Sequence, residues 1–524
     1  MYKKRVQILT ALFISVLLIL IVLIVDVNTR KYFGIPEIQI DQLQDLLQGK
    51  KEVFVLDKKL LINGEKVPYD KKEKIFYITQ SLSESNWQGL ITLKDKEPSE
   101  KVYLIAPQKD KLEAMASNSH YQICYTDDEK KVFQVCDVII SGLPIMDIVG
   151  NEMTLFSASE KNVSAEKSDI AYEVRGASSY YYEKKSYNLK LVDEKKSLLG
   201  LRTDDDWILS ALYDDIGLIH NQLSYQLWNE VASLEKTKGN YAVNQEYIEL
   251  LMDGEYLGVY ALSERGDTKQ FMMSDNDILF KVKGFPYDEG KGVIDLKYPN
   301  ETSLETDSLK NSFMEHFCED NEIPLRDSLI LIDYENALDY SLFCQIATAA
   351  DNTIKNSFLV GRRTGEYYKL CEIPWDCNMT WGIKSYVLTS EDRIYDTEFM
   401  SLVIRKLYKK DPEKINYDIA NRWFYLRDSV FSEKNIKAIL DENFLVLHRS
   451  GAYERNYCKW PTISLNTGEK DDLSDVSFSD IEKGEYVKST SVQEIWDDEK
   501  IYNFVEKRLA VLDEYYKQFL DVTE

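Results

Sequence analysis

Three polar residues in the C-terminal half of the chain have the types and spacing of a phosphotransfer site. Asp351 is followed five residues later by Asn356, and Asp376 comes twenty residues after that, beside a predicted strand. In kinase-type sites one Asp takes the proton of the acceptor hydroxyl, the Asn holds a metal ion, and the later Asp bridges this metal to the nucleotide phosphates. Asp and Asn are also the usual residues of turns, so ordinary turn and capping acids are the alternative interpretation.

The ligand preferences of magnesium fit these residue types. Mg²⁺ prefers hard oxygen ligands, and two protein groups can be completed to an octahedron by phosphate oxygens and water. Asn356 and Asp376 suit the ligand roles, which leaves Asp351 to orient the acceptor hydroxyl as a base. Apolar neighbours such as Ile354 and Ile373 indicate a partly buried setting. Because a buried carboxylate without a partner is costly, a metal ion or a basic group is expected beside the acids.

A basic strand earlier in the chain is a candidate for phosphate binding. In the segment that ends at Leu191, period-2 alternation places Lys184, Ser186, Asn188 and Lys190 on one face, opposite an apolar face. A kinase needs a strand-borne Lys for the α- and β-phosphates. We expect Lys190 in this role, with Lys185 as the next choice, although a solvated strand face would have the same pattern.

The turn before this strand has the composition of a phosphate cradle. Arg175 is followed by Gly176, which lets the backbone approach a phosphate, and by Ser178 and Ser179, which offer donors. The segment lacks the kinase G-x-G-x-x-G pattern, and a polar turn between two strands is the alternative.

Several further motifs accompany these residues in a fixed order, and together they resemble the spore coat protein H (CotH) kinase family. The resemblance covers about residue 150 to the C-terminus. It depends on RGASSYYYEKKSYNLKL from Arg175 to Leu191, Trp207 to Leu209, Asp214 to Leu223, Glu249 to Tyr260, Ser263-Glu264, and Asp351 to Trp381.

The resemblance implies an atypical protein kinase that transfers the γ-phosphoryl of ATP, with Mg²⁺ (or Mn²⁺), to Ser or Thr of a surface or coat protein. By this resemblance the catalytic residues are Asp351 and Lys190. The metal ligands are Asn356, Asp376 and Asn378, and the nucleotide contacts are Arg175, Gly176, Ser178, Ser179, Lys185, Lys190 and Glu264.

The chain departs from the family pattern at a few positions. Asn378 stands where the family usually has a second Asp after Pro-Trp-Asp, which puts a second metal ion in doubt. Ile216 and His220 replace a Lys and an Arg at the head of a predicted helix, where we expect Asp215 to cap the free N–H groups. Glu264 can lie near the nucleotide or be a surface acid.

Secondary-structure patterns predict the elements that position these residues. Short apolar runs between turn residues predict a small all-β domain within residues 28–150. Residues 151–524 are predicted to form an α+β, atypical protein-kinase-like catalytic domain. It contains a hairpin around Asp253-Gly254, a helix over 333–350 and strands over 357–360 and 367–373. The acidic stretch over 467–480 is predicted to be a surface loop.

The N-terminus contains an uncharged apolar run from Val6 to Val25 behind Lys3, Lys4 and Arg5. This run is long enough to cross a bilayer at about 1.5 Å per residue. Residues 1–27 are therefore predicted to be a transmembrane helix with its N-terminus in the cytoplasm and the body extracellular. A cleaved signal peptide is the alternative, although no small-residue cleavage site follows the run.

The composition limits the classes of partner. Acidic residues outnumber basic ones by 89 to 64, a formal net charge of −25. We therefore expect no nucleic acid as a partner, because phosphate backbones require basic surfaces, while a protein substrate is what the family resemblance implies. Seven cysteines without a C-x-x-C pair and four scattered histidines argue against a disulfide scaffold and a structural zinc site.

Two other functions stay open from the sequence. A non-catalytic surface, structural or adhesion protein of the same fold is favoured by Asn378. A carboxylate-based glycan hydrolase would need two acids facing each other at about 5–9.5 Å, and the sequence defines no such pair.

Overall fold

The computed structural model describes residues 31–83, 89–159, 162–176, 178–236, 238–284, 293–319, 321–383, 399–465, 488–491 and 497–520. The apolar run from Val6 to Val25 and the acidic stretch over 467–480 lie outside these ranges. Within them, no helix has the length and apolar character needed to span a membrane. The predicted single-pass membrane localisation is therefore not supported by the described residues, and the apolar run behind Lys3, Lys4 and Arg5 that predicted it lies outside them.

The chain forms two compact units, each made of several chain segments. The first contains Met1–Ala171, Tyr247–Tyr260 and Val446–Lys459, and the second contains Tyr172–Glu246, Ala261–Leu445 and Trp460–Glu524. The predicted boundary at residue 150 stays a prediction.

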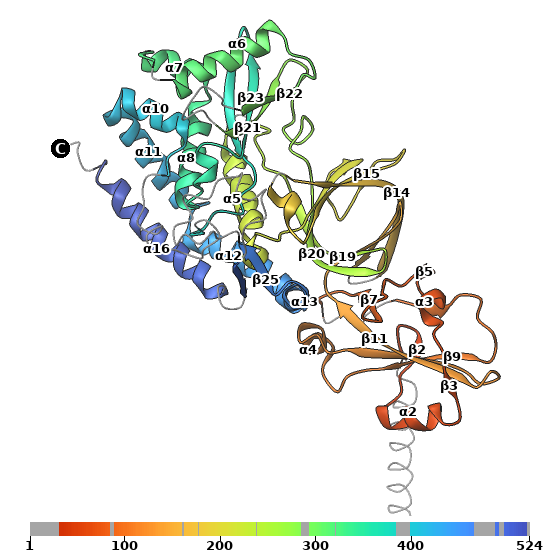
Figure 1. Cartoon of the computed structure of the whole chain (residues 1–524). Helices are drawn as coiled ribbons and strands as arrows, with labels where there is room; N and C mark the ends of the chain where they lie inside the picture. Colours follow the sequence, from red (N-terminus) through yellow and green to blue (C-terminus); the bar gives the residue numbers. More distant parts are fainter. Residues whose placement is uncertain are drawn as a thin grey trace, which may run out of the picture. The chain divides into compact units, whose positions relative to one another are not determined.

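The N-terminal part of the first unit is rich in short strands (Figure 1). Its largest sheet has the order β6-β7-β11-β10-β9, with β3 parallel to β11. Its apolar core includes the fully buried Phe76, Leu104 and Val138. The strands are β1 (Lys31–Tyr32), β2 (Ile35–Pro36), β3 (Lys51–Glu52), β4 (Leu60–Ile62), β5 (Glu65–Lys66), β6 (Tyr69–Asp70), β7 (Ile75–Thr79), β8 (Ile91–Leu93), β9 (Glu100–Ile105), β10 (Tyr121–Asp127) and β11 (Val132–Ser141).

Helices also belong to this unit. They are α2 (Ile40–Leu47), α3 (Leu56–Lys59), α4 (Lys111–Ala116) and α13 (Ala452–Lys459). A buried ion pair between Arg455 of α13 and Glu249, with Nη2 to Oε2 at 2.7 Å, joins segments two hundred residues apart in sequence.

Seven strands close into a barrel in the order β12-β13-β14-β15-β18-β20-β19. Strand β12 pairs parallel with β19, so that Ile145 lies opposite Glu249, while β15 pairs antiparallel with β18. The strands are β12 (Ile145–Val149), β13 (Glu152–Ala158), β14 (Val163–Arg175), β15 (Ser186–Leu191), β18 (Asp206–Ser210), β19 (Gln245–Met252) and β20 (Glu255–Ser263). The predicted hairpin is confirmed: Asp253 and Gly254 have φ values of 51° and 81° between β19 and β20.

The second unit contains the four-stranded sheet β22-β21-β23-β24 and most of the helices. The sheet strands are β21 (Ile278–Gly284), β22 (Val293–Tyr298), β23 (Ser357–Thr364) and β24 (Tyr367–Pro374). Two short pairs are β16 (Lys196–Ser197) with β17 (Thr203–Asp204), and β25 (Thr462–Leu465) with β26 (Lys488–Ser491). The helices are α5 (His220–Leu234), α6 (Leu304–Phe313), α7 (Leu325–Leu331), α8 (Tyr334–Ile346), α10 (Leu402–Lys410), α11 (Pro412–Arg427), α12 (Glu433–Arg449), whose last turn belongs to the first unit, and α16 (Asp498–Lys517).

The predicted fold class is wrong. The structure is a mixed α/β protein with a closed seven-stranded barrel and a large β-rich N-terminal region that also carries helices, in place of a small all-β domain and an α+β kinase-like domain, and the described part of the chain contains no helix that could span a membrane. Period-2 patterns locate individual strands, but barrel closure depends on pairings such as Ile145 with Glu249 between distant segments. Local sequence carries little information about such partners.

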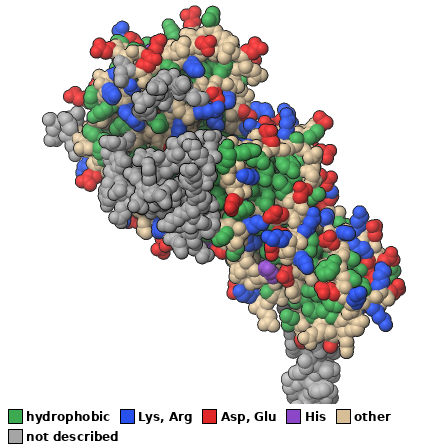
Figure 2. Space-filling view, viewed as in Figure 1, with side chains coloured by type: hydrophobic (Ala, Val, Ile, Leu, Met, Phe, Trp, Pro, Cys, Tyr) green, Lys and Arg blue, Asp and Glu red, His purple; other side chains and the backbone are tan. Residues whose placement is uncertain are grey.

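Acidic and basic side chains are interspersed on the described surface that faces the viewer in Figure 2. All seven cysteines, which lie within the described ranges, are free thiols.

Candidate functional site

The antiparallel strands β23 and β24 bring Asn356 and Asp376 together. Ser357 lies opposite Pro374 in the register, and the Trp375 backbone N–H donates to the Asn356 carbonyl at 3.0 Å. The two candidate metal ligands therefore sit on adjacent chain segments at one end of the hairpin. Both have left-handed backbone, with φ of 54° for Asn356 and 58° for Asp376, a conformation that Asn and Asp tolerate better than most residues.

The segment that carries Asp351 is hydrogen-bonded to the same end of the β23–β24 hairpin. Asp351 begins a single 3₁₀ turn, Asp351–Thr353, a few residues after α8. The next residue, Asn352, is buried, and its side-chain amide donates to the carbonyls of Asn356 at 2.8 Å and Trp375 at 2.9 Å. One amide group thus connects the segments of all three predicted residues, Asp351, Asn356 and Asp376.

The start of α5 supports the acid segment from another direction. The buried Asp215 carboxylate accepts from the backbone N–H groups of His220 at 2.8 Å and Asn221 at 2.9 Å, which confirms its predicted capping role. The Asn221 side-chain oxygen in turn accepts from the Cys377 backbone N–H at 2.8 Å. The Asp376 backbone N–H donates to the Tyr225 hydroxyl at 3.0 Å. These bonds fix the backbone on both sides of the Asp376 carboxyl.

Both basic and acidic side chains act on the carboxyl of Asp376. Its side chain reaches solvent, yet the protein packed around it removes hydration, and this desolvation raises the pKa of its carboxyl. Lys281 and Arg175 oppose the rise, while the negative charge of Asp351 adds to it. Burial together with the Asp376 charge also raises the pKa of the Asp214 carboxyl, to about 7. The carboxyl groups of Asp351 and Asp214 therefore act on that of Asp376 with the same sign of charge, and a positive ion would reduce this repulsion.

Lys281 is a site residue that the sequence analysis missed. It lies on β21, opposite Phe358 of β23, and its ammonium is 5.1 Å from the ring centroid of Trp375, the residue before Asp376. Desolvation by burial lowers the pKa of Lys281 to about 8, with the Asp376 charge opposing the shift. The only signal in the sequence was the alternation of Lys281 and Lys283 with apolar residues, which is also the pattern of a solvated strand face.

The predicted phosphate cradle begins beside this cluster. Arg175 ends β14, and burial lowers the pKa of its guanidinium while the Asp376 charge opposes this. Gly176 follows with φ of 123°, and a Cβ there would lie 2.0 Å from the Ser179 hydroxyl, so the tight turn requires glycine. Ser178 and Ser179 begin the 3₁₀ turn Ser178–Tyr181.

The lysines after this turn have different surroundings. The Lys185 ammonium donates to the Tyr180 carbonyl at 2.7 Å and so closes the loop. Lys184 is buried, and burial lowers the pKa of its amine well below the ordinary value. Lys190 is exposed on β15, with its ammonium 3.9 Å from the Asp205 carboxylate. The structure thus places Lys190 in a surface ion pair.

Two other predicted residues are engaged in the protein interior. Glu264 is buried, and its carboxylate accepts from the backbone N–H groups of Arg202 at 2.9 Å and Asn244 at 3.0 Å, which is a structural brace between loops. Asn378 is 8% exposed, two residues beyond Asp376. The assignments of Lys190, Glu264 and Asn378 stay predictions, and the cluster around Asp376 gives them no further support.

Among the described residues, no group of three or more His, Cys, Asp or Glu side chains is arranged to hold a metal ion. A metal at Asp376 would therefore be held by one carboxylate with the Asn356 amide oxygen and the ligand's own phosphates. These residues fit Mg²⁺, which is commonly bound by one or two protein groups together with phosphate oxygens and water.

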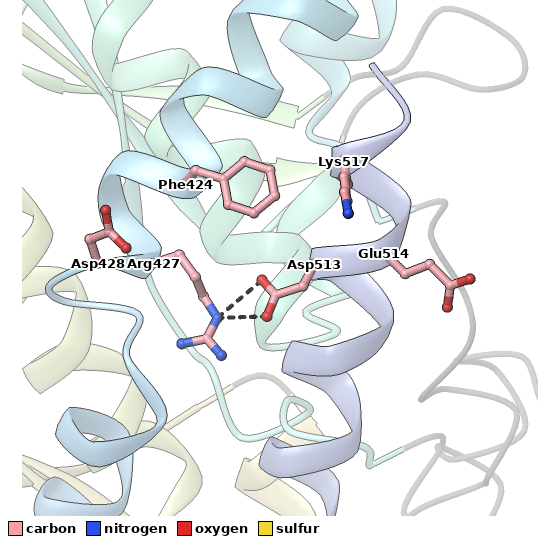
Figure 3. Close-up of a pocket in the computed structure, with 6 residues that line it drawn as sticks. All are labelled: Phe424, Arg427, Asp428, Asp513, Glu514 and Lys517. Atoms are coloured by element: carbon pink, nitrogen blue, oxygen red, sulfur yellow. Dashed lines mark hydrogen bonds and ion pairs between the residues drawn. The ribbon is translucent and has the colours of Figure 1, made fainter. Parts of the chain in front are cut away.

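A pocket elsewhere in the second unit has a different character. It lies between α11 and α16 and is lined by Phe424, Arg427, Asp428, Asp513, Glu514 and Lys517 (Figure 3). Arg427 and Asp513 form an ion pair across it at 3.1 Å. None of the predicted site residues lines it.

The fold and the cluster define a mixed α/β protein in which the segments of Asp351, Asn356 and Asp376 are hydrogen-bonded to one another. A sequence model of the family described as CotH kinase protein matches residues 172–512, about two thirds of the chain, and the chain belongs to this family. No curated protein is significantly similar to it in sequence.

Proposed function

We propose that this protein is an ATP-dependent protein kinase that transfers the γ-phosphoryl group to Ser or Thr of a protein substrate. The observation that carries the proposal is the placement of Asn356 beside Asp376, with Asp351 held to both segments by the Asn352 amide. Membership of the CotH kinase family supports the same reaction class. ATP and Mg²⁺ (or Mn²⁺) are part of the proposal.

The roles follow from the position of each group. Asp376 and Asn356 would hold a divalent cation, which neutralises charge on the transferring phosphoryl group when it is bound. Asp351 directly precedes Asn352, whose amide holds Asn356 and Trp375, and the Asp351 carboxylate can take the proton of an acceptor hydroxyl. Lys281 and Arg175 supply positive charge next to Asp376. They are the groups best placed to neutralise the remaining phosphates.

We propose for Lys281 the phosphate-binding role that the sequence analysis gave to Lys190. A phosphate-binding lysine must face the metal ligands, and Lys281 lies within electrostatic reach of Asp376 and over the Trp375 ring. Lys190 is 63% exposed and faces Asp205. We therefore assign phosphate binding to Lys281 as part of the proposal.

Two observations favour a second candidate function. Asn378 replaces the family's second acid and is buried, and no three-acid cluster exists among the described residues. Both features fit a non-catalytic member that keeps the fold for a structural or adhesive role.

Transfer of phosphate to a degenerate Ser/Thr peptide library from Mg²⁺-ATP, followed by mass spectrometry, tests the proposal. The full chain should phosphorylate library peptides, and Asp376→Asn should abolish the reaction. A well-folded wild-type protein that neither binds ATP nor phosphorylates any peptide would support the non-catalytic candidate.

A further inference from the structure

We propose that Lys355 is a catalytic residue of the phosphotransfer reaction and contacts the γ-phosphoryl group while that group moves to the acceptor. This inference rests on the proposed function and deepens it. Neither the sequence motifs nor the family match assigned a role to Lys355.

The position of Lys355 beside Asp351 and directly before Asn356 carries the inference. Its ammonium is 2.9 Å from the Asp351 carboxylate, the proposed base. The next residue in the chain is Asn356, a proposed metal ligand, whose carbonyl accepts at 3.0 Å from the backbone N–H of Trp375, the residue before Asp376. Lys355 is thus a cation that adjoins both the proposed base, Asp351, and a proposed metal ligand, Asn356.

The local backbone holds Lys355 in this position. The Lys355 N–H donates to the Asp351 carbonyl at 2.8 Å, which closes one turn between the two residues. The following residue, Asn356, has its carbonyl bonded to Trp375 and to the Asn352 amide. The backbone of Lys355 is therefore anchored, while its side chain is 40% exposed and its ammonium can reach a ligand.

A cation at this place would stabilise the transition state of the transfer. During transfer, the acceptor oxygen forms a bond to the γ-phosphorus while the bond from that phosphorus to the bridging oxygen of ADP breaks. The hydroxyl proton passes to Asp351, and negative charge is spread over the three non-bridging oxygens of the phosphoryl group. An ammonium group has three donors, so Lys355 can keep one contact to Asp351 and give another to a phosphoryl oxygen.

A structural interpretation must be weighed against this one. Pairs four residues apart on a turn are common on protein surfaces and contribute little. The chain offers such a pair as a matched control, Lys437 with Glu433 at 2.7 Å, which has similar exposure on α12. The two lysines differ in what surrounds them, since only Lys355 adjoins the acids of the candidate site.

The test compares ADP formation and ATP affinity in the full chain, with Mg²⁺-ATP and the degenerate Ser/Thr peptide library as substrates. Lys355→Met should lower kcat by about 10²–10³-fold, the usual loss when one group that stabilises the transition state is removed. The Kd for Mg²⁺-ATP should change less than about threefold, because the contact forms mainly during transfer. Lys355→Arg should recover part of the rate, and Lys437→Met should match the wild type.

A double variant separates direct contact from action through Asp351. If Lys355 contacts the phosphoryl group, Lys355→Met should lower the residual rate of Asp351→Asn by at least about tenfold more. An unchanged residual rate would overturn the catalytic role and leave Lys355 as a residue that positions Asp351. Wild-type kcat in Lys355→Met would also overturn the inference, whereas failure of the unmutated protein to transfer phosphate would overturn the proposed function and this inference together.

Discussion

The side-chain oxygen of Asn221 accepts a hydrogen bond of 2.8 Å from the backbone N–H of Cys377, the residue after Asp376. Asn221 stands at the start of α5 and is itself held by the Asp215 carboxylate, which accepts from its side-chain amide at 2.9 Å. A helix cap is thereby connected to the acid segment of the candidate site. This relationship gives the Asp215 to Asn221 motif a role in positioning the acid.

Asn221→Ala should therefore weaken the site as well as the fold. We expect a loss of about 1–3 kcal/mol in the free energy of unfolding, because a partly buried N–H loses its acceptor. Mg²⁺-dependent ATP affinity should also fall, since the Asp376 segment loses one of the side-chain hydrogen bonds that hold it. Urea denaturation and calorimetric titration measure the two effects. Asn421→Ala, which removes an exposed amide on α11, should change neither quantity.

Lys281→Met should lower ATP affinity about ten- to a hundred-fold. This range corresponds to a charge-assisted contact of about 1.5–3 kcal/mol. Adenosine, which has no phosphate to meet the ammonium, should bind Lys281→Met and the wild type equally. Lys190→Met, which removes a surface partner of Asp205, should leave ATP affinity unchanged. If parallel titrations show that Lys190→Met weakens ATP binding and Lys281→Met does not, the phosphate-binding role belongs to Lys190.

Asp351→Asn should retain ATP binding and lose transfer. The proposed role of Asp351 concerns only the acceptor proton, and general-base groups typically contribute about 10²–10⁴-fold to the rate. Single-turnover transfer to the peptide library gives the rate, and titration gives the affinity. Glu433→Gln removes the acid of the matched surface pair and should leave both at the wild-type level. A full rate in Asp351→Asn would refute the base assignment.

The raised pKa values of two buried glutamates predict how the free energy of unfolding depends on pH. Burial raises the pKa of Glu235 and of Glu372 to about 8. Glu235 is bonded to the side-chain amides of Asn240 and Asn336, and Asp339 and Asp333 add to its shift. The side-chain amide of Asn336 also donates to the backbone carbonyl of Glu372 at 3.1 Å, which connects the Glu235 carboxyl to the backbone of Glu372.

The sign follows from proton binding. Between the ordinary Glu value near 4.5 and the folded value near 8, the folded state keeps a proton that the unfolded state has lost. The free energy of unfolding should therefore fall as pH rises through this window, by up to about 1.4 kcal/mol per pH unit for each group. Glu372→Gln should flatten the slope in urea denaturation from pH 5 to 8.5, and the exposed Glu366→Gln should not. Equal slopes in all three proteins would contradict the assignment.

The sequence predicted many local elements and few of the long-range pairings. The strands around Arg362, the hairpin at Asp253-Gly254 and the capping role of Asp215 are confirmed, because turn chemistry and periodicity act over a few residues. The closed barrel was not predicted, since β12 and β19 meet across about a hundred residues of chain. No local pattern specifies that partner.

For the candidate site too, the sequence predicted the local motif and missed a residue that long-range strand pairing brings in. The motif around Asp351, Asn356 and Asp376 is local, and the β23–β24 register brings the last two together. Lys281 comes from a strand seventy residues before Asp351, and its role depends on the pairing of β21 with β23. Lys190 had the expected residue type on a basic strand face, but tertiary structure places it in a surface ion pair. Residue type and period cannot distinguish these two lysines.

The central claim is that Asp376 and Asn356 form a site for a divalent cation and ATP. Calorimetric titration of ATP into the unmutated full chain and into Asp376→Asn, with Mg²⁺ and then with excess EDTA, tests it most directly. We predict saturable binding by the unmutated chain in Mg²⁺ only, and its loss in Asp376→Asn, while both proteins unfold at similar urea concentrations. Equal ATP affinity in the two proteins, or binding that is indifferent to Mg²⁺, would contradict the claim.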